Sequence, residues 1–339
     1  NPPFLFGFAM LERLRGRARE ALATLERIET LSPGAVPRFQ LAQALLKSGN
    51  LARGMAEMAH RPRVGLPPVP GAAAWEGERL EARTILVRDE GDAIDAVMLG
   101  RYIPRVAAQG GLVTVECVPE AARLLATLPG VEAVVPRGQP LPAMDLVVDL
   151  RDVPRILGTT SRTTPPRDVP YLHLPDDMAP RAFPGDGRLK VGMAWAGRDT
   201  DPAVPVRHLL RLVSEPGLRL VSLQRGPRAA DLAATGADAF IDDLGAGCAD
   251  LADVAAVIAG LDLVVATDCA EAHIAGALGK PVWVLLPRGN DWRWVDHRDD
   301  SVWYPTMRVF RQAEDGSWDR AVARVLASVE AMAAGMRGH

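Results

Sequence analysis

Residues Leu261–Pro287 constrain the possible folds of this chain most strongly, because their pattern indicates strand, turn, helix, turn and strand in close succession. Leu261–Ala266 is a short, β-branched apolar run, typical of a strand buried on both faces of a parallel sheet. Thr267 or Asp268 is the expected N-cap of the following helix, and Gly279 is expected to end it before a second buried strand. The stretch therefore predicts a doubly wound α/β fold, in which a helix N-terminus at a strand end can bind an anion.

The composition is that of an ordinary globular protein, and it argues against several classes of function. With 339 residues the chain is long enough for two domains with separate cores and a further segment. A net charge of -3 gives no basic surface for nucleic acid or an anionic membrane. No apolar run approaches the roughly 20 residues of a membrane-spanning helix, and the first residues lack the charged start of a signal peptide. We therefore expect a cytoplasmic protein without nucleic-acid partners or membrane spans.

The three cysteines, Cys117, Cys248 and Cys269, are far apart in the sequence and form no CxxC pair or Cys/His cluster. This spacing argues against a disulfide scaffold and a zinc site, and it fits a reducing compartment. We expect no metal and no bound cofactor.

Residues 1–62 are predicted to be helical and weakly repetitive. Gly16 and Gly49 each lie at an expected turn between two helices, and their separation is close to the tetratricopeptide period of about 34 residues. Fewer than the three repeats that such arrays need for stability are visible. The region is therefore either a tetratricopeptide-like helical hairpin that caps the next domain or part of an array that binds a protein partner.

Two series of alternating strands and helices follow. A connector rich in proline, glycine and alanine, Arg63–Ala74, precedes the first series, and a proline-rich linker, Thr164–Pro184, separates the two. We assign an N-terminal α/β domain to residues 75–183 and a C-terminal one to residues 184–339. Two such domains in tandem predict a cleft between the carboxyl ends of their strands. The last amphipathic helix, Trp318–Ala334, could return to the first domain.

The predicted strands of the first series are Arg83–Val87, Leu112–Glu116, Val131–Val135 and Asp145–Asp149. Those of the second are Lys190–Trp195, Leu218–Leu223, Leu263–Ala266, Val282–Leu286 and Met307–Phe310.

A series of landmarks in a fixed order extends over roughly residues 75–312. The first half contains WEGERLEARTILVRDE, GRYIP, LPGVEAVV and DVPYL; the second contains KVGMAWAG, LVSLQRG, DLADVAAVIAGLDLVV, ATDCAEAHIAGALGKPVWVLLP, DWRW and DSVWYPTMRVFRQ. Together they resemble bacterial tetratricopeptide proteins that carry a heptosyltransferase-like glycosyltransferase module of the GT-B fold. The resemblance implies that the C-terminal domain binds a nucleotide-diphosphate sugar. It also implies that the sugar is transferred with inversion, in the interdomain cleft, to a hydroxyl of an acceptor glycan or protein.

The resemblance further implies that a DT/S…H element contributes to donor binding. The matching residues here are Asp268, Cys269, Ala270 and His273. A helix N-terminus at this turn offers N–H groups to the leaving diphosphate without reorganisation. The alternatives are a plain N-cap for Asp268 and a hydrogen bond on the helix face for His273.

Residues at the ends of two other strands complete the predicted donor site. Trp195, Ala196 and Gly197 follow the first strand of the second series, and the glycine permits close approach of a phosphate or sugar. Gln224 follows the next strand, where the resemblance implies contact with the nucleotide. Arg207 can balance the diphosphate charge or lie on the surface as a solvated side chain.

The resemblance also implies a general base, an aspartate in a glycine-rich turn after the first strand of the N-terminal domain. A gapless alignment from Thr84 to Pro104 places this aspartate at Asp95. A local match at Gly91 selects Asp92 but needs an insertion. We favour Asp95 and keep Asp92 as the alternative; either aspartate could instead cap the following helix.

Four departures from the family pattern bear on activity. Asp92 and Ile94 replace two glycines, and Cys269 replaces a hydroxyl with a weaker hydrogen-bonding group. Glu271 adds a carboxylate that would repel an anionic donor if it faces the pocket. Three functions therefore remain open: an active glycosyltransferase, a catalytically degenerate relative that binds a nucleotide, sugar or protein partner, and an interaction protein that acts through its helical region.

Overall fold

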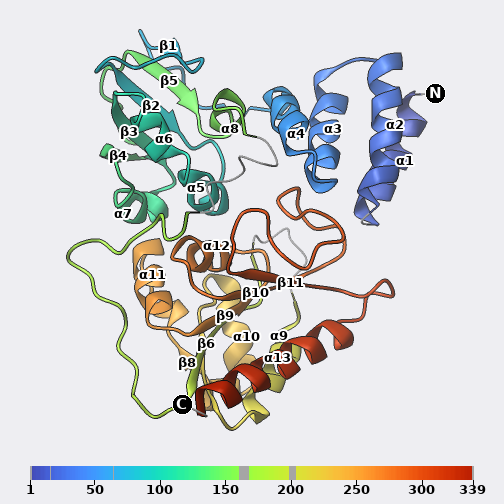
Figure 1. The fold of residues 1–339 in the computed structure, drawn as a ribbon, viewed down its shortest axis with the longest axis vertical. Helices are drawn as coiled ribbons and strands as arrows, with labels where there is room; N and C mark the ends of the chain where they lie inside the picture. The colour runs from blue at the N-terminus through green and yellow to red at the C-terminus, as the bar shows by residue number, and fades with distance from the viewer. Residues whose placement is uncertain (1, 16, 64, 160–167, 198–203, 338–339) are drawn as a thin grey trace. The chain divides into compact units, whose positions relative to one another are not determined.

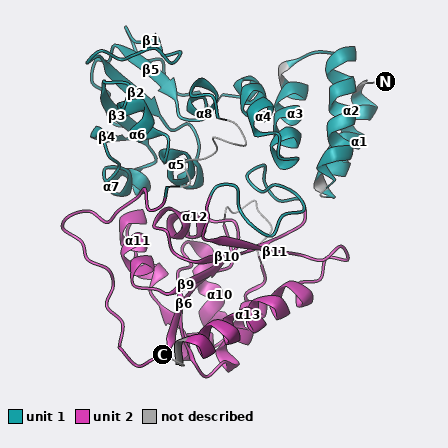
Figure 2. Cartoon of the chain, in the orientation of Figure 1, with its two compact units in different colours: residues 1–168, 289–303 teal, residues 169–288, 304–339 magenta. Residues whose placement is uncertain are grey.

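The computed structural model describes residues 2–15, 17–63, 65–159, 168–197 and 204–337 (Figure 1). The chain divides into two compact units, shown in Figure 2. Unit 1 comprises residues 1–168 and 289–303, and unit 2 comprises residues 169–288 and 304–339. The division after residue 168 lies inside the predicted linker Thr164–Pro184, of which residues 164–167 lie outside the described part.

Unit 1 begins with four helices joined by short turns: α1 (Pro2–Leu14), α2 (Ala18–Leu31), α3 (Ala35–Lys47) and α4 (Leu51–Glu57). Small and apolar side chains form their shared core: Ala9, Ala21, Leu25, Ile28, Leu41, Ala44 and Leu45. Gly49 forms the turn between α3 and α4 with a φ of 89°, whereas Gly16 lies outside the described residues. The helices are where the sequence predicted them, and their relation to tetratricopeptide repeats stays a prediction.

The α/β part of unit 1 has a parallel sheet with strand order β1-β5-β2-β3-β4. Its strands are β1 (Ala73–Ala74), β2 (Thr84–Arg88), β3 (Leu112–Cys117), β4 (Val131–Pro136) and β5 (Leu146–Asp149). Its helices are α5 (Ala93–Gly100), α6 (Ile103–Ala107), α7 (Ala122–Leu125) and α8 (Val153–Ile156). The chain order reverses between β2 and β5, which makes the carboxyl ends of these two strands the switch point of the sheet.

Unit 2 has a parallel sheet with strand order β11-β10-β9-β6-β7-β8. Its strands are β6 (Leu189–Ala194), β7 (Leu218–Ser222), β8 (Asp242–Asp243), β9 (Leu263–Ala266), β10 (Val282–Leu286) and β11 (Met307–Arg311). Its helices are α9 (Val206–Leu209), α10 (Ala230–Ala234), α11 (Leu251–Ala259), α12 (Ala270–Ala277) and α13 (Asp319–Arg337). In chain order this is the 3-2-1-4-5-6 arrangement of dinucleotide-binding folds, with its switch point between β6 and β9.

Single turns of 3₁₀ helix lie between these elements: η1 (Met58–His60), η2 (Pro119–Ala121), η3 (Leu210–Ser214), η4 (Pro227–Ala229), η5 (Ala237–Ala239) and η6 (Gly245–Gly247). The sequence predicted every strand of both sheets except the two-residue strands β1 and β8. So short a strand carries too few residues to show a period of two.

The last helix buries its apolar face in unit 2. Val322, Val325 and Val329 of α13 belong to the same core as Trp283 of β10 and Phe310 of β11. Full burial of each such side chain contributes roughly 1.5–3 kcal/mol. The apolar stripe of this helix is thus used within unit 2, and the possible return of the helix to the first domain stays a prediction.

Residues 289–303, assigned from the sequence to the C-terminal domain, belong to unit 1. The indole N–H of Trp303 donates to the carbonyl of Arg293 over 2.8 Å, and the rings of Trp292 and Trp303 meet edge to face at 6.1 Å. Lys47 of α3 donates to the side-chain oxygen of Asn290 over 2.8 Å. The segment is thus tied to the helical region and supplies a buried arginine to the α/β part of the unit.

Candidate functional site

The switch point of the unit 2 sheet brings together the loop after β6 and the turn after β9. A Cβ on Gly197 would lie 2.2 Å from the carbonyl oxygen of Asp268, so only glycine fits there without movement of the backbone. Trp195 and Ala196 precede it and are buried. The predicted donor-binding residues that follow these two strands therefore do lie together. Glycine is required at position 197 at least in part because the two loops are in close contact there.

Gln224 joins the loop after β6 to the end of β7. Its side-chain oxygen accepts hydrogen bonds from the backbone N–H groups of Trp195 and Ala196, both at 2.9 Å. Its amide donates to the carbonyls of Ala196 and Arg225 over 3.2 and 3.0 Å. With 4% of its surface exposed, Gln224 uses its hydrogen-bonding groups to hold this loop. The geometry thus supports a positioning role more than the direct nucleotide contact that the sequence suggested.

A buried row of three polar side chains lies beside the same turn. His273 Nε2 is 3.1 Å from Asp268 Oδ1, and His273 Nδ1 is 3.0 Å from the hydroxyl of Tyr304. Because an ionised carboxylate only accepts hydrogen bonds, a neutral His273 donates from Nε2 and accepts at Nδ1. The N-cap of this helix is Cys269 rather than Asp268, and Asp268 contacts His273. His273 does make the hydrogen bond on the helix face that the sequence allowed as an alternative. Tyr304 was not predicted, although it lies in the quoted motif DSVWYP.

Helix α12 begins one or two residues later than predicted, since Thr267 or Asp268 was the expected N-cap. Its N-cap is Cys269, whose side chain makes no capping hydrogen bond. Burial, then the nearby carboxylate of Glu271, raise the pKa of the Cys269 thiol well above its usual range. Ala270 and Glu271 form the first turn, and Glu271 is only 6% exposed. This helix start therefore contains a neutral thiol and a carboxylate where an anionic ligand would approach.

Two further predicted residues have different surroundings. Trp195 is fully buried and its indole N–H donates to Asp231 over 3.1 Å, so the ring is part of the core. Arg207 lies on the short helix α9 and is exposed. Residues 198–203 of the loop before it lie outside the described part. The role of Arg207 in balancing ligand charge stays a prediction.

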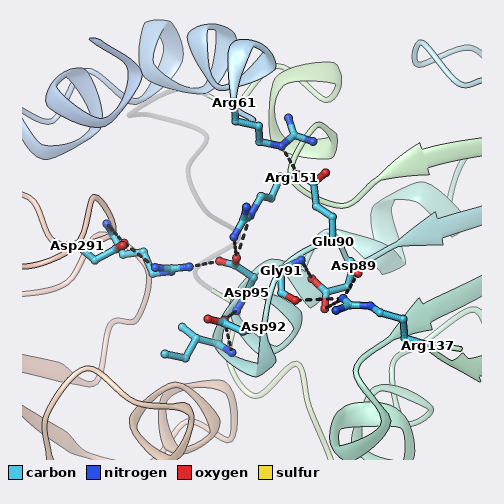
Figure 3. A network of polar contacts seen from close by, with 11 residues as sticks. Arg61, Asp89, Glu90, Gly91, Asp92, Asp95, Arg137, Arg151 and Asp291 are labelled. Carbon is cyan, nitrogen blue, oxygen red and sulfur yellow. Dashed lines mark hydrogen bonds and ion pairs between the residues drawn. The ribbon is translucent and has the colours of Figure 1, made fainter. Parts of the chain in front are cut away.

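In unit 1, Asp95 of α5 lies at the centre of a buried ionic network (Figure 3). One carboxylate oxygen accepts from Nε of Arg151 over 2.9 Å and also from its Nη2, and the other accepts from Nη2 of Arg293. Arg293 in turn donates to Asp291 over 2.6 Å. Asp95 is fully buried. Burial alone would raise its pKa, but the attraction of Arg293 and Arg151 is larger and holds the pKa of Asp95 below its usual range.

These contacts bear on the predicted general base. A carboxylate held by two guanidinium groups, with a lowered pKa, is a poor proton acceptor at neutral pH. The alternative, Asp92, is the N-cap of α5: its side chain accepts from the N–H groups of Ile94 and Asp95 over 3.0 and 3.2 Å. The base role of either aspartate stays a prediction, and the capping alternative describes what Asp92 does in this structure.

A third carboxylate of this region, Asp89, was missed. It directly follows β2 at the switch point of the unit 1 sheet and is fully buried. It accepts from the N–H of Gly91 over 3.0 Å and lies 3.3 Å from Nη2 of Arg137. Burial, then repulsion by Asp95, raise the pKa of Asp89 to about 7. Its place directly after an apolar strand was the signal that could have found it.

The raised pKa of Asp89 predicts a measurable dependence of stability on pH. Its folded pKa of about 7 lies above the ordinary value of 3.8, so the folded state binds more protons between these values and loses stability as the pH rises through them. We expect the unfolding free energy of the wild type to fall by about 2–3 kcal/mol, relative to Asp89→Asn, between pH 5 and pH 8. Denaturant titrations at both pH values measure this difference.

Asp145→Asn provides the control. Hydrogen bonds from Thr84 lower the pKa of Asp145, so this carboxyl stays ionised throughout the range and its variant should differ from the wild type by a constant amount. A constant difference for Asp89→Asn as well would show that Asp89 does not titrate near neutral pH.

None of the described helices combines the length and the hydrophobicity that crossing a bilayer requires. No group of three or more His, Cys, Asp or Glu side chains within the described ranges is arranged to hold a metal ion.

Comparison with known proteins relates this fold to sugar transferases. Residues 209–287 match the model of Glycosyltransferase family 9 (heptosyltransferase). The chain is 25% identical to Protein FlbA of Caulobacter vibrioides in an alignment that covers 94% of this chain. The chain spans about 60% of the length of that relative.

Solved structures with a similar fold include three bacterial proteins. The E. coli ADP-heptose LPS heptosyltransferase II is 16% identical, with a TM-score of 0.51 over 75% of this chain and 99% of the other. A family 9 glycosyl transferase of Veillonella parvula is 10% identical, with a TM-score of 0.53 over 70% and 88%. The E. coli heptosyltransferase WaaC with ADP-2-deoxy-2-fluoro heptose is 15% identical, with a TM-score of 0.51 over 73% and 99%. The chain thus has a heptosyltransferase-like α/β fold, and its segment 209–287 matches the family 9 glycosyltransferase model.

Proposed function

We propose that this chain is a glycosyltransferase that takes a sugar from a nucleotide-diphosphate donor of the ADP-heptose kind and transfers it, with inversion, to a hydroxyl of an acceptor glycan or protein. The observation that carries the proposal is the convergence of a glycine loop and a helix N-terminus at the switch point of the unit 2 sheet. Open α/β sheets bind ligands at this position, and a helix N-terminus favours phosphate. The similar fold of a heptosyltransferase solved with an ADP-sugar analogue supports the choice of donor.

The chemistry of the site follows from charge. Transfer of the sugar leaves negative charge on the diphosphate, and backbone N–H groups at the start of α12 would stabilise that charge without reorganisation. The row from Asp268 through His273 to Tyr304 fixes the turn that holds this helix start. The carboxylate of Glu271 would repel an anionic ligand at this helix start. A nearby cationic side chain, such as Arg207, would offset this repulsion and strengthen binding.

A second candidate function is donor binding without transfer. It is favoured by the contacts of Asp95, whose carboxylate is already engaged by Arg151 and Arg293, and of Asp92, which caps α5. A chain in which neither carboxylate can accept a proton would bind a nucleotide sugar and release it unchanged. Both functions require nucleotide binding, but only the transferase turns the donor over.

Binding of ADP to the whole chain tests the shared part of both functions. We expect ADP to raise the melting temperature, because a ligand that binds only the folded state stabilises it. Asp268→Ala and His273→Ala each remove a member of the buried row, and loss of a buried hydrogen bond of about 1–3 kcal/mol should weaken ADP binding by roughly 5–150-fold. Isothermal titration calorimetry measures the affinities, with the exposed Asp238→Ala as the matched control.

Turnover separates the two functions. Release of ADP from ADP-heptose, followed in the presence of candidate acceptors, would support the transferase. Saturable ADP binding with no release would select the binding function. A wild type that binds neither ADP nor other nucleoside diphosphates would contradict both.

A further inference from the structure

Unit 1 contains a cavity of about 510 Å³ that the proposed donor site does not use. It lies at the carboxyl ends of β2 and β5, the switch point of the sheet, and is bounded by residues 65–72 of the connector and by α8. Its volume falls within the roughly 300–1,000 Å³ of small-molecule sites. All of its lining residues belong to unit 1.

Two arginines that line this cavity have a hydrogen-bond donor without an acceptor in the described structure. Arg88 is 5% exposed; its Nε donates to Glu116 over 2.6 Å and its Nη1 to the carbonyl of Pro67 over 2.7 Å, but its buried Nη2 has no partner among the described residues. The buried Nε of Arg155 likewise has no hydrogen-bond acceptor within the described part of the chain. An unpaired buried donor is unfavourable, so the cavity favours a ligand with acceptor oxygens.

The charge of the lining excludes simple ions. Its charged members are the cations Arg63, Arg88 and Arg155 and the carboxylates Glu76, Glu90, Asp149 and Asp152. Arg61, which is buried and does not line the cavity, pairs with Glu90 and Asp152, and Arg63 pairs with Asp149 and Asp152. The lining therefore has no excess of positive charge that would favour a phosphate or other anion. A simple cation would offer no acceptor to the two arginines.

The remaining lining is apolar, with Leu66, Val69, Trp75 and Ile156 among its members. A suitable ligand is thus neutral, has apolar faces, and carries both acceptors for the arginines and donors for the carboxylates. We propose that this cavity binds a sugar residue, whose ring and hydroxyl oxygens accept from Arg88 and Arg155 and whose hydroxyl groups donate to Asp149 and its neighbours. The inference rests on unit 1 alone and does not depend on donor binding in unit 2.

Saturation-transfer NMR on the whole chain tests the proposal, with the methyl glycosides of glucose, galactose, mannose and N-acetylglucosamine as probes. We expect at least one glycoside to receive magnetisation from the wild type. Ala72→Phe fills the cavity without changing its charge, and Arg155→Gln removes one unpaired donor. Each should reduce the signal by about fivefold or more, the fold-change expected for a lost hydrogen bond or a blocked site.

Arg83→Gln is the matched control for Arg155→Gln. Arg83 and Arg155 have similarly exposed side chains, each 3.8–4.0 Å from a surface glutamate, but Arg83 does not line the cavity. An unchanged signal in Ala72→Phe, or an equal loss in Arg83→Gln, would overturn the proposal. So would the absence of a signal from all four glycosides. ADP binding by Ala72→Phe, measured in parallel, distinguishes failure at this cavity from failure of the donor site.

Discussion

Asp95→Ala should destabilise unit 1 by about 3–5 kcal/mol, the effect expected when one partner is removed from a buried ion pair. The substitution leaves Arg293, which is 2% exposed, with a buried charge that has lost Asp95. Arg151 loses the same partner but is more exposed and can turn toward water. Most of the cost therefore arises at Arg293, and denaturant unfolding followed by tryptophan fluorescence should detect it, since Trp292 packs under that guanidinium at 4.8 Å.

The dependence of this effect on pH identifies its cause. Because the folded pKa of Asp95 is lowered, its contribution is present above the unfolded pKa of about 4 and is lost as the pH falls through the folded value. The ionisation of Asp95 itself contributes a constant difference between wild type and Asp95→Ala from pH 5 to pH 8, and this difference should narrow below about pH 4. A separate change near neutral pH is expected because the substitution also removes the repulsion that raises the pKa of Asp89.

Two variants serve as controls. Asp300→Ala removes an exposed carboxylate that pairs with Arg298 in the same unit, and should change stability by no more than about 0.5 kcal/mol. The triple replacement of Asp95, Arg151 and Arg293 by apolar residues removes all three charges and should recover much of the stability lost by Asp95→Ala. If Asp95→Ala unfolds like the wild type, the network does not hold unit 1 together. If Asp95→Asn folds normally but slows transfer by about 10²–10⁴-fold, Asp95 acts as the general base after all.

Gly197→Ala should disrupt the proposed donor site more than any other single methyl group added to unit 2. The new Cβ would lie 2.2 Å from the carbonyl oxygen of Asp268, so one of the two loops must move. We expect a loss of stability of about 1–3 kcal/mol from overpacking. Because the displaced turn begins α12, we also expect ADP affinity to fall by roughly 10–100-fold, measured by calorimetry at a temperature where the variant is folded.

Two other glycines of unit 2 separate these effects. Gly260→Ala meets the carbonyl oxygen of Arg181 at 2.1 Å, an equally severe clash at the end of α11 and away from the switch point. It should cost similar stability and leave ADP affinity unchanged. Gly185→Ala meets nothing within 4 Å and should change neither. Wild-type ADP affinity in folded Gly197→Ala would mean that nucleotide does not use this crevice.

The sequence alone determined the α/β character of the chain and most of its strands. Runs such as Leu263–Ala266 and Val282–Leu286 are apolar throughout, and the parallel sheet buries both of their faces. The turns at their ends could be placed because the strands alternate with helices, so Gly197 and Asp268 were expected at one edge of one sheet. Local patterns suffice for this because burial of a short strand depends mainly on its own residues.

Local sequence patterns predicted hydrogen-bond partners less well where two elements can both bind one side chain. Thr267 or Asp268 was expected as the N-cap of the helix, but Cys269 is the N-cap, and Asp268 contacts His273. Gln224 holds the loop after β6, which its sequence position did not show, and its contact with a nucleotide stays a prediction. In each case the residue was correctly placed in the fold, and its hydrogen-bond partner was decided by side chains and backbone groups that only folding brings near.

Only the tertiary structure decided the surroundings of Asp95 and the membership of residues 289–303 in unit 1. Arg151 lies 56 positions from Asp95 and Arg293 lies 198 positions from it, so no helical or strand period connects them. Such pairs form because the folded chain removes three charges from water at one point and must compensate each of them there. The local sequence shows only that Asp95 lies near the start of a helix. Its pKa, and therefore its possible chemical role, depends on arginines that are distant in the sequence and close in the folded chain.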